Sequence, residues 1–474
     1  MVKNSDTRQH MAPLPRVPTG IPGLDEVTGG GFLKSGVYIL QGAPGAGKTI
    51  LANQIGFRHA AAGGHVVYVT MLAESHARLL QHMQTFSFFE PGAVPKKVYY
   101  VSAFNALRTE GLGGVMRLLQ GEMRTHRAGL LILDGLVMAA SAAPSDEALK
   151  LFISEIQAHS TLSGCTTLLL TSDHADRPVS AEQTMVDGIV LLRERPYGPR
   201  RERNLEVVKF RGSRTLRGNH TFLIGADGIV LYPRLEAARR QSPGDTMQPV
   251  GLSTGVPGLD RMLDIGGYAR GGVTVVTGPS GSGKTTLALH FLAQAHGAEK
   301  GLYFGFYESP ELLRQIGQRL GIDEAGTLAS DAVEFEWSAL GERALDELAA
   351  RLLGRVRARG ASRVVIDGLG AFLTTPSFEE RGACFLAALM NELRAAGATT
   401  VLTMEEQAMA MPLQLTAMSA VADTILRLRV SEADAVRRFM WIGKSRMIRT
   451  DLRVRELVLA AHGLEVREEA DVDA

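Results

Sequence analysis

Two glycine-rich segments have the residues needed to bind nucleotide phosphates. Both fit the pattern G-x-x-x-x-G-K-[ST], with GAPGAGKT at 42–49 and GPSGSGKT at 278–285. Glycines let backbone N–H groups approach the phosphates, the lysine binds the β- and γ-phosphates, and the final hydroxyl ligates Mg²⁺. We therefore predict that two continuous runs contact nucleotide: Gly42, Ala43, Pro44, Gly45, Ala46, Gly47, Lys48, Thr49 and Ile50, and Gly278, Pro279, Ser280, Gly281, Ser282, Gly283, Lys284, Thr285 and Thr286.

The context of both segments argues against a chance match. Each follows a short apolar run, 37–40 or 273–276, and precedes helix-forming residues. This strand–loop–helix order places a phosphate at a helix N-terminus, where backbone N–H groups are free to bind it. The repeat also extends beyond the loops, because TGIPGLD at 19–25 recurs as TGVPGLD at 254–260. The sequence therefore predicts a tandem duplication with two nucleotide sites.

Length and composition set limits on the protein class. The 474 residues are enough for two α/β domains, and 51 basic against 50 acidic residues give a net charge of only +1. This balance does not favour a general affinity for DNA or anionic membranes. Cys165 and Cys384 fall one per copy, which does not suggest a disulfide scaffold. We expect a cytoplasmic protein without a secretory signal or membrane span, since no apolar run is long enough.

The coarse pattern predicts the fold. Short apolar strands alternate with helices, which indicates a mainly parallel sheet covered on both faces. Near the end of each copy the pattern changes to strands joined by turns, so we expect an antiparallel C-terminal extension. The expected fold class is therefore α/β, with two tandem P-loop domains. The expected boundaries are an N-terminal tail at 1–16, domains at 17–240 and 251–460, a linker at 241–250, and a charged tail at 461–474.

Carboxylates at strand ends supply the remaining chemistry. Asp134 and Asp367 each end an apolar strand, where they are expected to hold Mg²⁺ together with Thr49 and Thr285. The alternative is that each aspartate only caps the turn before the following glycine.

Hydrolysis also needs a group that orients or deprotonates the attacking water. Glu74 and Glu308 follow the second strand of each copy and are the candidates. Their alternative role is charge compensation at a helix N-terminus.

With these features the chain resembles the KaiC family, the double-domain RecA-superfamily ATPases of the cyanobacterial circadian clock and their relatives. The resemblance rests on the paired P-loops, the TG-x-P-G-LD lead-in, the glutamate after strand two, and a K-x-R segment near the end of each copy. It implies a nucleotide-dependent hexameric ring with ATP and Mg²⁺ between subunits. The K-x-R pairs, which would reach the neighbour's γ-phosphate, are Lys209 with Arg211 and Lys444 with Arg446. Their alternative role is that of exposed basic residues on an edge strand.

The sequence departs from the family pattern at two places. The family has two adjacent glutamates after strand two, whereas this chain has one per copy, and Glu74 is displaced by an apparent one-residue insertion. At the family's two phospho-acceptor positions the chain has Ser419 and Ala420. Ser419 is therefore the one candidate autokinase site, in the second domain. The resemblance also implies a role in signalling or timing, with KaiB-like or other signalling proteins as candidate partners.

Two other function classes use the same fold. A RecA/RadA-like DNA-dependent ATPase would need a basic DNA-facing surface, and the densest basic cluster is RERPYGPRRER at 193–203. Glutamates interrupt this cluster and a Pro-Tyr-Gly-Pro turn divides it, so it is more typical of a solvated hairpin tip. DNA is therefore not the expected partner. A nucleotide-gated scaffold would need the same pocket as an ATPase, so the sequence leaves that class open.

Overall fold

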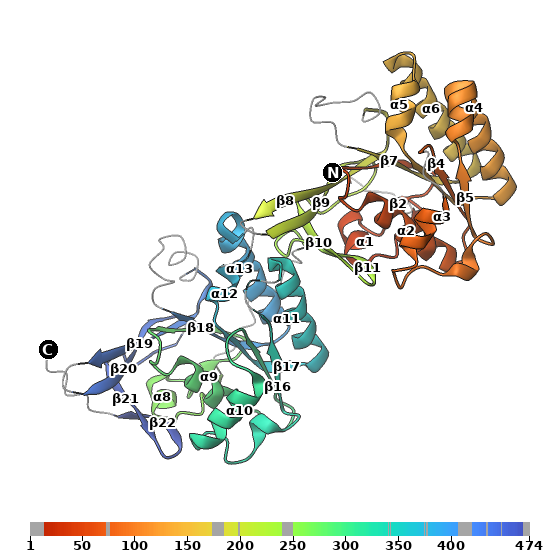
Figure 1. Cartoon of the computed structure of the whole chain (residues 1–474). Helices are drawn as coiled ribbons and strands as arrows, with labels where there is room; N and C mark the ends of the chain where they lie inside the picture. The colour runs from red at the N-terminus through yellow and green to blue at the C-terminus, as the bar shows by residue number, and fades with distance from the viewer. Residues whose placement is uncertain are drawn as a thin grey trace, which may run out of the picture. The chain divides into compact units, whose positions relative to one another are not determined.

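The computed structural model describes residues 14–72, 76–172, 184–197, 200–238, 250–339, 341, 343–373, 375, 378–405, 420–432, 435–446 and 448–467. The chain divides into two compact units, Met1–Ala238 and Arg239–Ala474. Each unit has the same architecture, a central sheet with helices on both faces (Figure 1). Among the described residues, no helix is both long and apolar enough to cross a membrane.

The first unit is built on a mixed sheet with the strand order β11-β10-β9-β8-β3-β7-β6-β4-β5. The strands from β8 to β5 in this order pair in parallel, and β8 to β11 pair antiparallel. The predicted fold class is therefore confirmed. The strands are β3 (Val37–Gly42), β4 (Val66–Thr70), β5 (Val98–Ser102), β6 (Leu130–Asp134), β7 (Thr166–Thr171), β8 (Gly188–Tyr197), β9 (Arg200–Phe210), β10 (His220–Gly225) and β11 (Gly228–Tyr232), with a separate pair β1 (Arg16–Val17) and β2 (Phe32–Leu33).

Alternating side chains of the parallel strands form two cores. Tyr38 and Leu40 of β3 pack on the side of α2, whereas Val37 and Ile39 pack on the side of α4 and α6. Burial on both faces explains why these strands have nearly continuous apolar sequences. The helices are α1 (Pro22–Thr28), α2 (Lys48–Ala61), α3 (His76–Met83), η1 (Pro91–Ala93), α4 (Phe104–His126), α5 (Leu136–Ala142) and α6 (Asp146–Ser163).

The second unit repeats this arrangement with the order β16-β15-β17-β18-β14-β19-β20-β21-β22. Its strands are β14 (Val273–Gly278), β15 (Lys300–Gly305), β16 (Val333–Trp337), β17 (Ala361–Asp367), β18 (Thr399–Glu405), β19 (Thr424–Glu432), β20 (Val436–Ser445), β21 (Arg455–Ala460) and β22 (Gly463–Arg467), with β12 (Gly251–Leu252) paired to β13 (Tyr268–Ala269). Its helices are α8 (Pro257–Met262), α9 (Lys284–Ala293), α10 (Pro310–Arg319), η2 (Thr327–Ala329), α11 (Leu345–Arg359), α12 (Gly370–Leu373) and α13 (Phe378–Ala395).

One predicted boundary was wrong. The charged tail was expected from residue 461, but residues 463–467 form β22, which pairs antiparallel with β21. The physical reason is that apolar and charged residues alternate along this strand. Leu464 is buried and Val466 packs against the core, whereas Glu465 and Arg467 supply the charge on the intervening positions. A half-buried edge strand was therefore taken for a polar tail.

The TG-x-P-G-LD lead-in has a structural role in both units. Asp25 Oδ1 accepts hydrogen bonds from the backbone and the side chain of Thr19, both at 2.7 Å. Asp260 makes the same two contacts with Thr254, at 2.8 and 2.6 Å. The glycine of the motif allows close packing, because a Cβ at Gly23 would lie 2.0 Å from a backbone oxygen of β11. The motif thus joins the start of each unit to its C-terminal hairpin.

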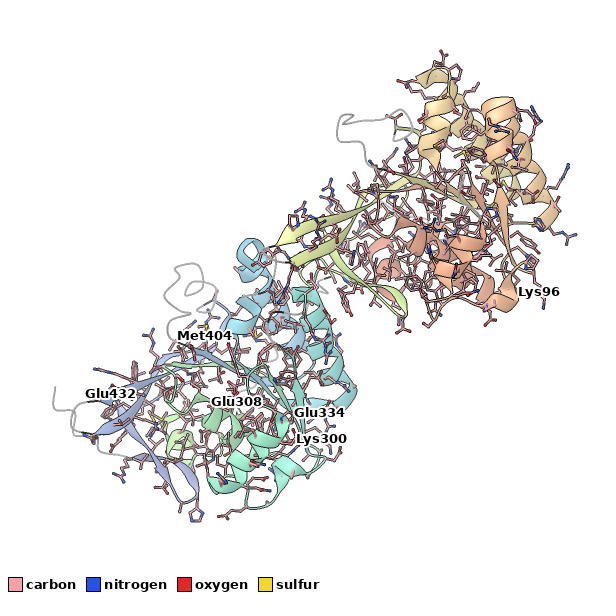
Figure 2. All side chains as sticks on the ribbon, in the orientation of Figure 1. Lys96, Lys300, Glu308, Glu334, Met404 and Glu432 are labelled. Atoms are coloured by element: carbon pink, nitrogen blue, oxygen red, sulfur yellow. The ribbon has the colours of Figure 1, made fainter. Side chains whose placement is uncertain are left out.

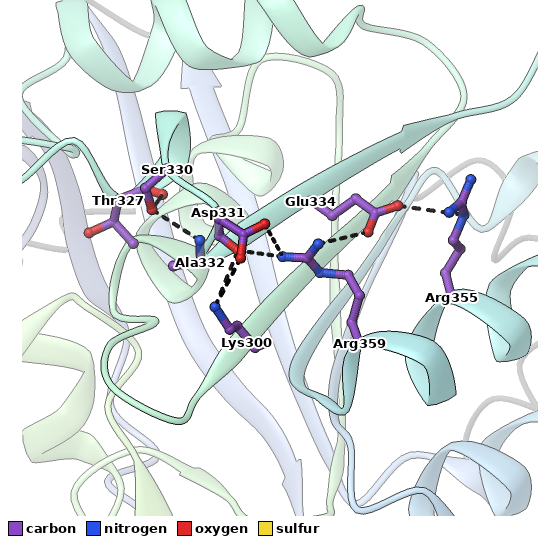
Figure 3. Close-up of polar contacts among 8 residues, drawn as sticks. All are labelled: Lys300, Thr327, Ser330, Asp331, Ala332, Glu334, Arg355 and Arg359. Carbon is purple, nitrogen blue, oxygen red and sulfur yellow. Dashed lines mark hydrogen bonds and ion pairs between the residues drawn. The ribbon is translucent and has the colours of Figure 1, made fainter.

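The edge strand of the second sheet carries a ladder of ion pairs (Figure 3). Glu334 of β16 lies 3.1 Å from Arg359 and 3.5 Å from Arg355, both on α11. Asp331, just before β16, bridges Arg359 and Lys300. Glu336, two residues after Glu334 on β16, also lies 3.5 Å from Arg355. Alternate strand residues advance by about 6.6 Å and every fourth helix residue by about 6.0 Å, so the acidic row of the strand matches the basic row of the helix. The ladder attaches β16 to α11.

Candidate functional site

The two P-loops begin where a central strand ends and finish where a helix begins. Helices α2 and α9 start at Lys48 and Lys284, and the preceding glycines have φ of 100° and 103°. Residues other than glycine rarely adopt such positive φ values. The predicted nucleotide-contacting residues therefore form one continuous turn in each unit, and the first residues of the helix follow it directly.

The P-loop lysines bind their own loops. Lys48 Nζ donates to the carbonyl oxygen of Gly42 at 2.6 Å and to that of the next residue at 3.0 Å. Lys284 Nζ repeats both contacts, with Gly278 at 3.0 Å and the following residue at 2.8 Å. Burial lowers the pKa of Lys284, and nearby carboxylates partly oppose that shift. Each ammonium is thus held against its own loop by two carbonyl oxygens.

The structure brings the predicted aspartates to the P-loop threonines. Thr49 Oγ1 lies 3.3 Å from Asp134 Oδ2, and Thr285 Oγ1 lies 2.8 Å from Asp367 Oδ2. This geometry follows from the topology, because β6 and β17 end on the same edge of the sheet as the loops. Two oxygen ligands of the kind that Mg²⁺ prefers therefore converge at each site.

Hydroxyl groups that were not predicted from the sequence also contact these aspartates. Tyr68 Oη donates to Asp134 Oδ2 at 2.6 Å, and Tyr303 Oη donates to Asp367 Oδ2. In the second unit Thr403 Oγ1 donates to the other carboxylate oxygen, Oδ1. The available signal was a tyrosine two positions before the end of the second parallel strand in both copies. Whether this tyrosine contacts the aspartate depends on the strand register, which cannot be read from the sequence.

Glu308 lines a cavity of about 530 Å³ in the second unit. Glu308 and Lys300 lie at opposite ends of β15 (Figure 2), and Glu308 is at the end that faces the P-loop. Burial, and then the charge of Asp367, raise the pKa of Glu308. The cavity is lined by Ser280, Gly281, Gly283, Lys284, Thr285, Thr286, Tyr307, Glu308, Asp367, Gly368, Gly370, Thr403, Met404, Glu405, Arg438, Leu459 and Leu464.

Two predicted residues, Glu74 and Ser419, lie outside the described residues. The strand register still locates the one-residue insertion in the first copy. Thr70 pairs with Asp134, and Gly305 pairs with Asp367. Counted from these equivalent positions, the first-copy glutamate comes four residues later and the second-copy glutamate three residues later.

The K-x-R residues lie away from the P-loop of their own unit. Lys209 Nζ donates to the carbonyl oxygen of Thr184 at 3.0 Å, and Lys444 Nζ to that of Ala422 at 3.1 Å. Burial, and then the neighbouring arginine, lower the pKa of both lysines. Arg211 and Arg446 are exposed. Neither Lys444 nor Arg446 is among the described residues that line the cavity around Lys284.

The arginine-rich segment 193–203 forms the predicted hairpin. Strands β8 and β9 pair up to the contact of Tyr197 with Arg200. Arg193 lies 3.6 Å from Glu206, and Glu194 lies within 3.4 Å of both Arg201 and Arg203. The equivalent of Arg203 in the second unit, Arg438, instead donates to the P-loop carbonyl of Gly281 at 2.9 Å. Glu194, which interrupts the cluster, and Glu206, which follows it, therefore pair with three of its five arginines.

Comparison with known proteins agrees with this arrangement. A family model described as "ATPase: KaiC" matches residues 17–236 and 252–471, which is most of both units. The chain is 26% identical to the circadian clock protein KaiC2 of Synechocystis sp., over 98% of this chain and 83% of that protein. It is 25% identical to the circadian clock oscillator protein KaiC of Prochlorococcus marinus, over 96% of this chain and 92% of that protein. With two matched repeats and two P-loop sites of the same geometry, the chain belongs to the KaiC family of ATPases.

Proposed function

We propose that both units bind ATP with Mg²⁺ and hydrolyse it. The observation that carries this proposal is the repeated contact between a P-loop threonine and a strand-terminal aspartate, at 3.3 Å in one unit and 2.8 Å in the other. The P-loop lysines stand beside these pairs and would bind the β- and γ-phosphates. Membership of an ATPase family supports the reaction, and the repeated geometry supports a nucleotide site in each unit.

The residues at both sites fit Mg²⁺. In the role proposed here, Thr49 and Asp134 hold the ion in the first unit, and Thr285 and Asp367 hold it in the second. Bound Mg²⁺ would neutralise charge on the phosphates. Few protein ligands are needed, because Mg²⁺ keeps several waters and takes further oxygens from the phosphates.

We assign water activation to one glutamate in each unit, Glu308 in the second and Glu74 in the first. Glu308 lines the same cavity as Lys284 and Asp367, and its raised pKa brings it closer to the operating pH of a general base. The assignment of Glu74 rests on its position in the repeat.

We further propose that ATP is bound between subunits of a nucleotide-dependent homo-hexamer. Lys209 and Arg211, and likewise Lys444 and Arg446, would approach the γ-phosphate held by a neighbouring copy. Their position away from the P-loop of their own unit supports action in trans. Such a cation stabilises charge in the transition state. A signalling or timing role through KaiB-like or other protein partners, and serine autokinase activity at Ser419, are the finer parts of this proposal.

The deciding experiment removes one P-loop lysine at a time. Lys48→Ala and Lys284→Ala should each abolish one of two nucleotide sites, and the double variant should neither bind nor hydrolyse ATP. Binding is measured with a fluorescent ATP analogue, and hydrolysis by phosphate release with and without Mg²⁺. Lys300→Ala is a matched control, because this lysine lies at the opposite end of β15 from the cavity. Wild-type binding and turnover in the double variant would refute the proposal.

A further inference from the structure

A buried tyrosine contacts the proposed Mg²⁺-binding aspartate in each unit. The hydroxyl of Tyr68 lies 2.6 Å from Asp134 Oδ2, and the hydroxyl of Tyr303 bonds Asp367 Oδ2. We call Tyr68 and Tyr303 the clamp tyrosines. Their side chains are almost fully enclosed, at 1% and 2% exposure. Each hydroxyl reaches the same carboxylate oxygen as the P-loop threonine of its unit.

The strand register explains this contact. Tyr68 pairs with Ile132 on the neighbouring strand β6, two residues before Asp134. Successive strand side chains alternate between faces, so the side chains at 132 and 134 share one face of the sheet with that of the tyrosine. Tyr303 pairs in the same way with Val365, two residues before Asp367. Each clamp tyrosine is thus the diagonal neighbour of the aspartate, within the reach of a long side chain.

The clamp hydroxyl occurs in both units, whereas another buried tyrosine hydroxyl beside it occurs only in the first. In the first unit Tyr100 stands beside Tyr68, and its hydroxyl bonds Asn53 at 2.7 Å. In the second unit the position of Tyr100 is Phe335, and the helix position of Asn53 is Leu289. That hydroxyl and its partner have therefore been exchanged together for apolar groups. The clamp hydroxyl is present in both units.

The hydroxyl of each clamp tyrosine is a hydrogen-bond donor, because a phenol with an ordinary pKa of about 10 keeps its proton at neutral pH. A protonated phenol donates to a carboxylate but cannot replace it as an anionic metal ligand. In each unit the tyrosine hydroxyl is therefore the donor and the aspartate carboxylate is the acceptor.

We propose that Tyr68 and Tyr303 are positioning residues that orient the aspartates and thereby lower the Mg²⁺ concentration at which each site binds nucleotide. This inference rests on the function proposed above. With one lone pair of Oδ2 engaged by the phenol, the carboxylate is held facing the P-loop threonine. The aspartate then pays less conformational entropy when it binds the hydrated ion.

The test replaces only the hydroxyl. Tyr68→Phe is made in the Lys284→Ala background and Tyr303→Phe in the Lys48→Ala background, so that each variant reports one site. Binding of a fluorescent ATP analogue is titrated with Mg²⁺ in the full-length protein. Loss of a hydrogen bond to a charged group should raise the half-saturating Mg²⁺ concentration about tenfold. Binding at saturating Mg²⁺ should be retained.

Matched controls distinguish positioning from general stability. Tyr38→Phe and Tyr268→Phe also remove buried hydroxyls, but the hydroxyl of Tyr38 bonds the backbone of Leu33 rather than the site. Both controls should keep the parental Mg²⁺ requirement. In an Asp367→Asn background, Tyr303→Phe should cause no further change, since the acceptor charge has gone.

An unchanged Mg²⁺ requirement in both clamp variants would overturn the inference while leaving the proposed ATPase intact. An equal shift in the Tyr38→Phe and Tyr268→Phe controls would also overturn it, because the effect would then be structural. If the parent proteins bind no Mg²⁺–nucleotide at all, the proposed function fails, and the inference fails with it.

Discussion

At the residue scale, burial sets the proton affinity of the proposed base. Burial, and then the negative charge of Asp367, raise the pKa of Glu308. A general base works only when it is deprotonated. The raised pKa means that Glu308 takes up its proton at a higher pH than the ordinary value of about 4.3 for a glutamate. Acidification should therefore stop hydrolysis earlier than it would for an exposed carboxylate.

The raised pKa of Glu308 leads to a pH prediction for the second site. In the Lys48→Ala background, the rate of phosphate release should fall as the pH decreases through the raised pKa of Glu308, while analogue binding persists. Glu308→Gln should lower the rate on the order of 100-fold and remove this acidic limb. Glu405→Gln is the control, because Glu405 lines the same cavity but is not the assigned base. A wild-type rate in Glu308→Gln would exclude the assignment.

Sequence patterns predicted the pairing of Thr49 with Asp134 and of Thr285 with Asp367, because a P-loop and an apolar strand ending in Asp have fixed places in this topology. The hydroxyl donors around the aspartates could not be predicted in the same way. Thr403 contacts Asp367, but the register places Leu170 at the equivalent position beside Asp134. Such contacts depend on cross-strand register, which arises from the packing of the whole sheet.

At the element scale, the two units fasten the P-loop helix to the C-terminal hairpin with different side chains. In the first unit Gln54 of α2 bonds both the backbone N–H and the carbonyl of Ile229, at 2.7 and 3.1 Å. In the second unit His290 of α9 accepts a hydrogen bond from the backbone of Leu464 at 2.9 Å. The amide does not titrate near neutral pH, whereas the imidazole does.

The second unit should therefore lose stability in acid. Burial lowers the pKa of His290 to about 4 in the folded state, against about 6.5 in the unfolded chain. The unfolded state then binds the proton more readily, so the stabilisation is complete above pH 6.5 and declines as the pH falls toward 4. Between pH 7 and pH 5 this amounts to about 2 kcal/mol of unfolding free energy.

His290→Gln, which copies the first unit, should remove most of this pH dependence. Both tryptophans, Trp337 and Trp441, lie in the second unit, so tryptophan fluorescence during urea unfolding reports that unit selectively. His296→Gln is the control, because this histidine is exposed. An unchanged difference between pH 7 and pH 5 in His290→Gln would show that other groups cause the acid sensitivity.

The elements themselves show where periodicity was informative. The buried parallel strands β3 and β14 begin at the same residues as the apolar runs 37–40 and 273–276, because those runs are continuous. The strand β22 was missed because only alternate residues are apolar and the others are charged. Its identity as a strand depends on pairing with β21, a tertiary property that composition over a short window does not contain.

At the scale of the whole molecule, the proposed trans role of the K-x-R residues would link the chemistry of one copy to that of another. Lys444 and Arg446 lie on or just after β20, away from the cavity that contains Lys284 and Glu308. If they act in trans, one functional second site needs residues from two copies. Assembly should then depend on bound nucleotide, because the ligand stabilises the associated state by mass action.

Subunit mixing tests this directly. In a Lys48→Ala background, Glu308→Gln lacks the base and Lys444→Ala lacks the trans cation, so each variant alone should be inactive at the second site. Mixed rings contain interfaces in which Glu308 comes from one variant and Lys444 from the other. Random mixing of equal amounts should restore roughly a quarter of the parental rate in a closed ring of head-to-tail contacts.

The control mixes Lys444→Ala with Arg446→Ala in the same background. Both changes fall on the K-x-R side of the interface and leave the P-loop of the second unit intact, so no mixed contact has a complete K-x-R pair and activity should stay absent. Light scattering with a slowly hydrolysed ATP analogue confirms that the mixtures assemble. Recovery in the first mixture but not in the second requires a site shared between copies. If neither mixture recovers although both assemble, Lys444 acts within its own subunit or not at all, and the trans assignment is wrong.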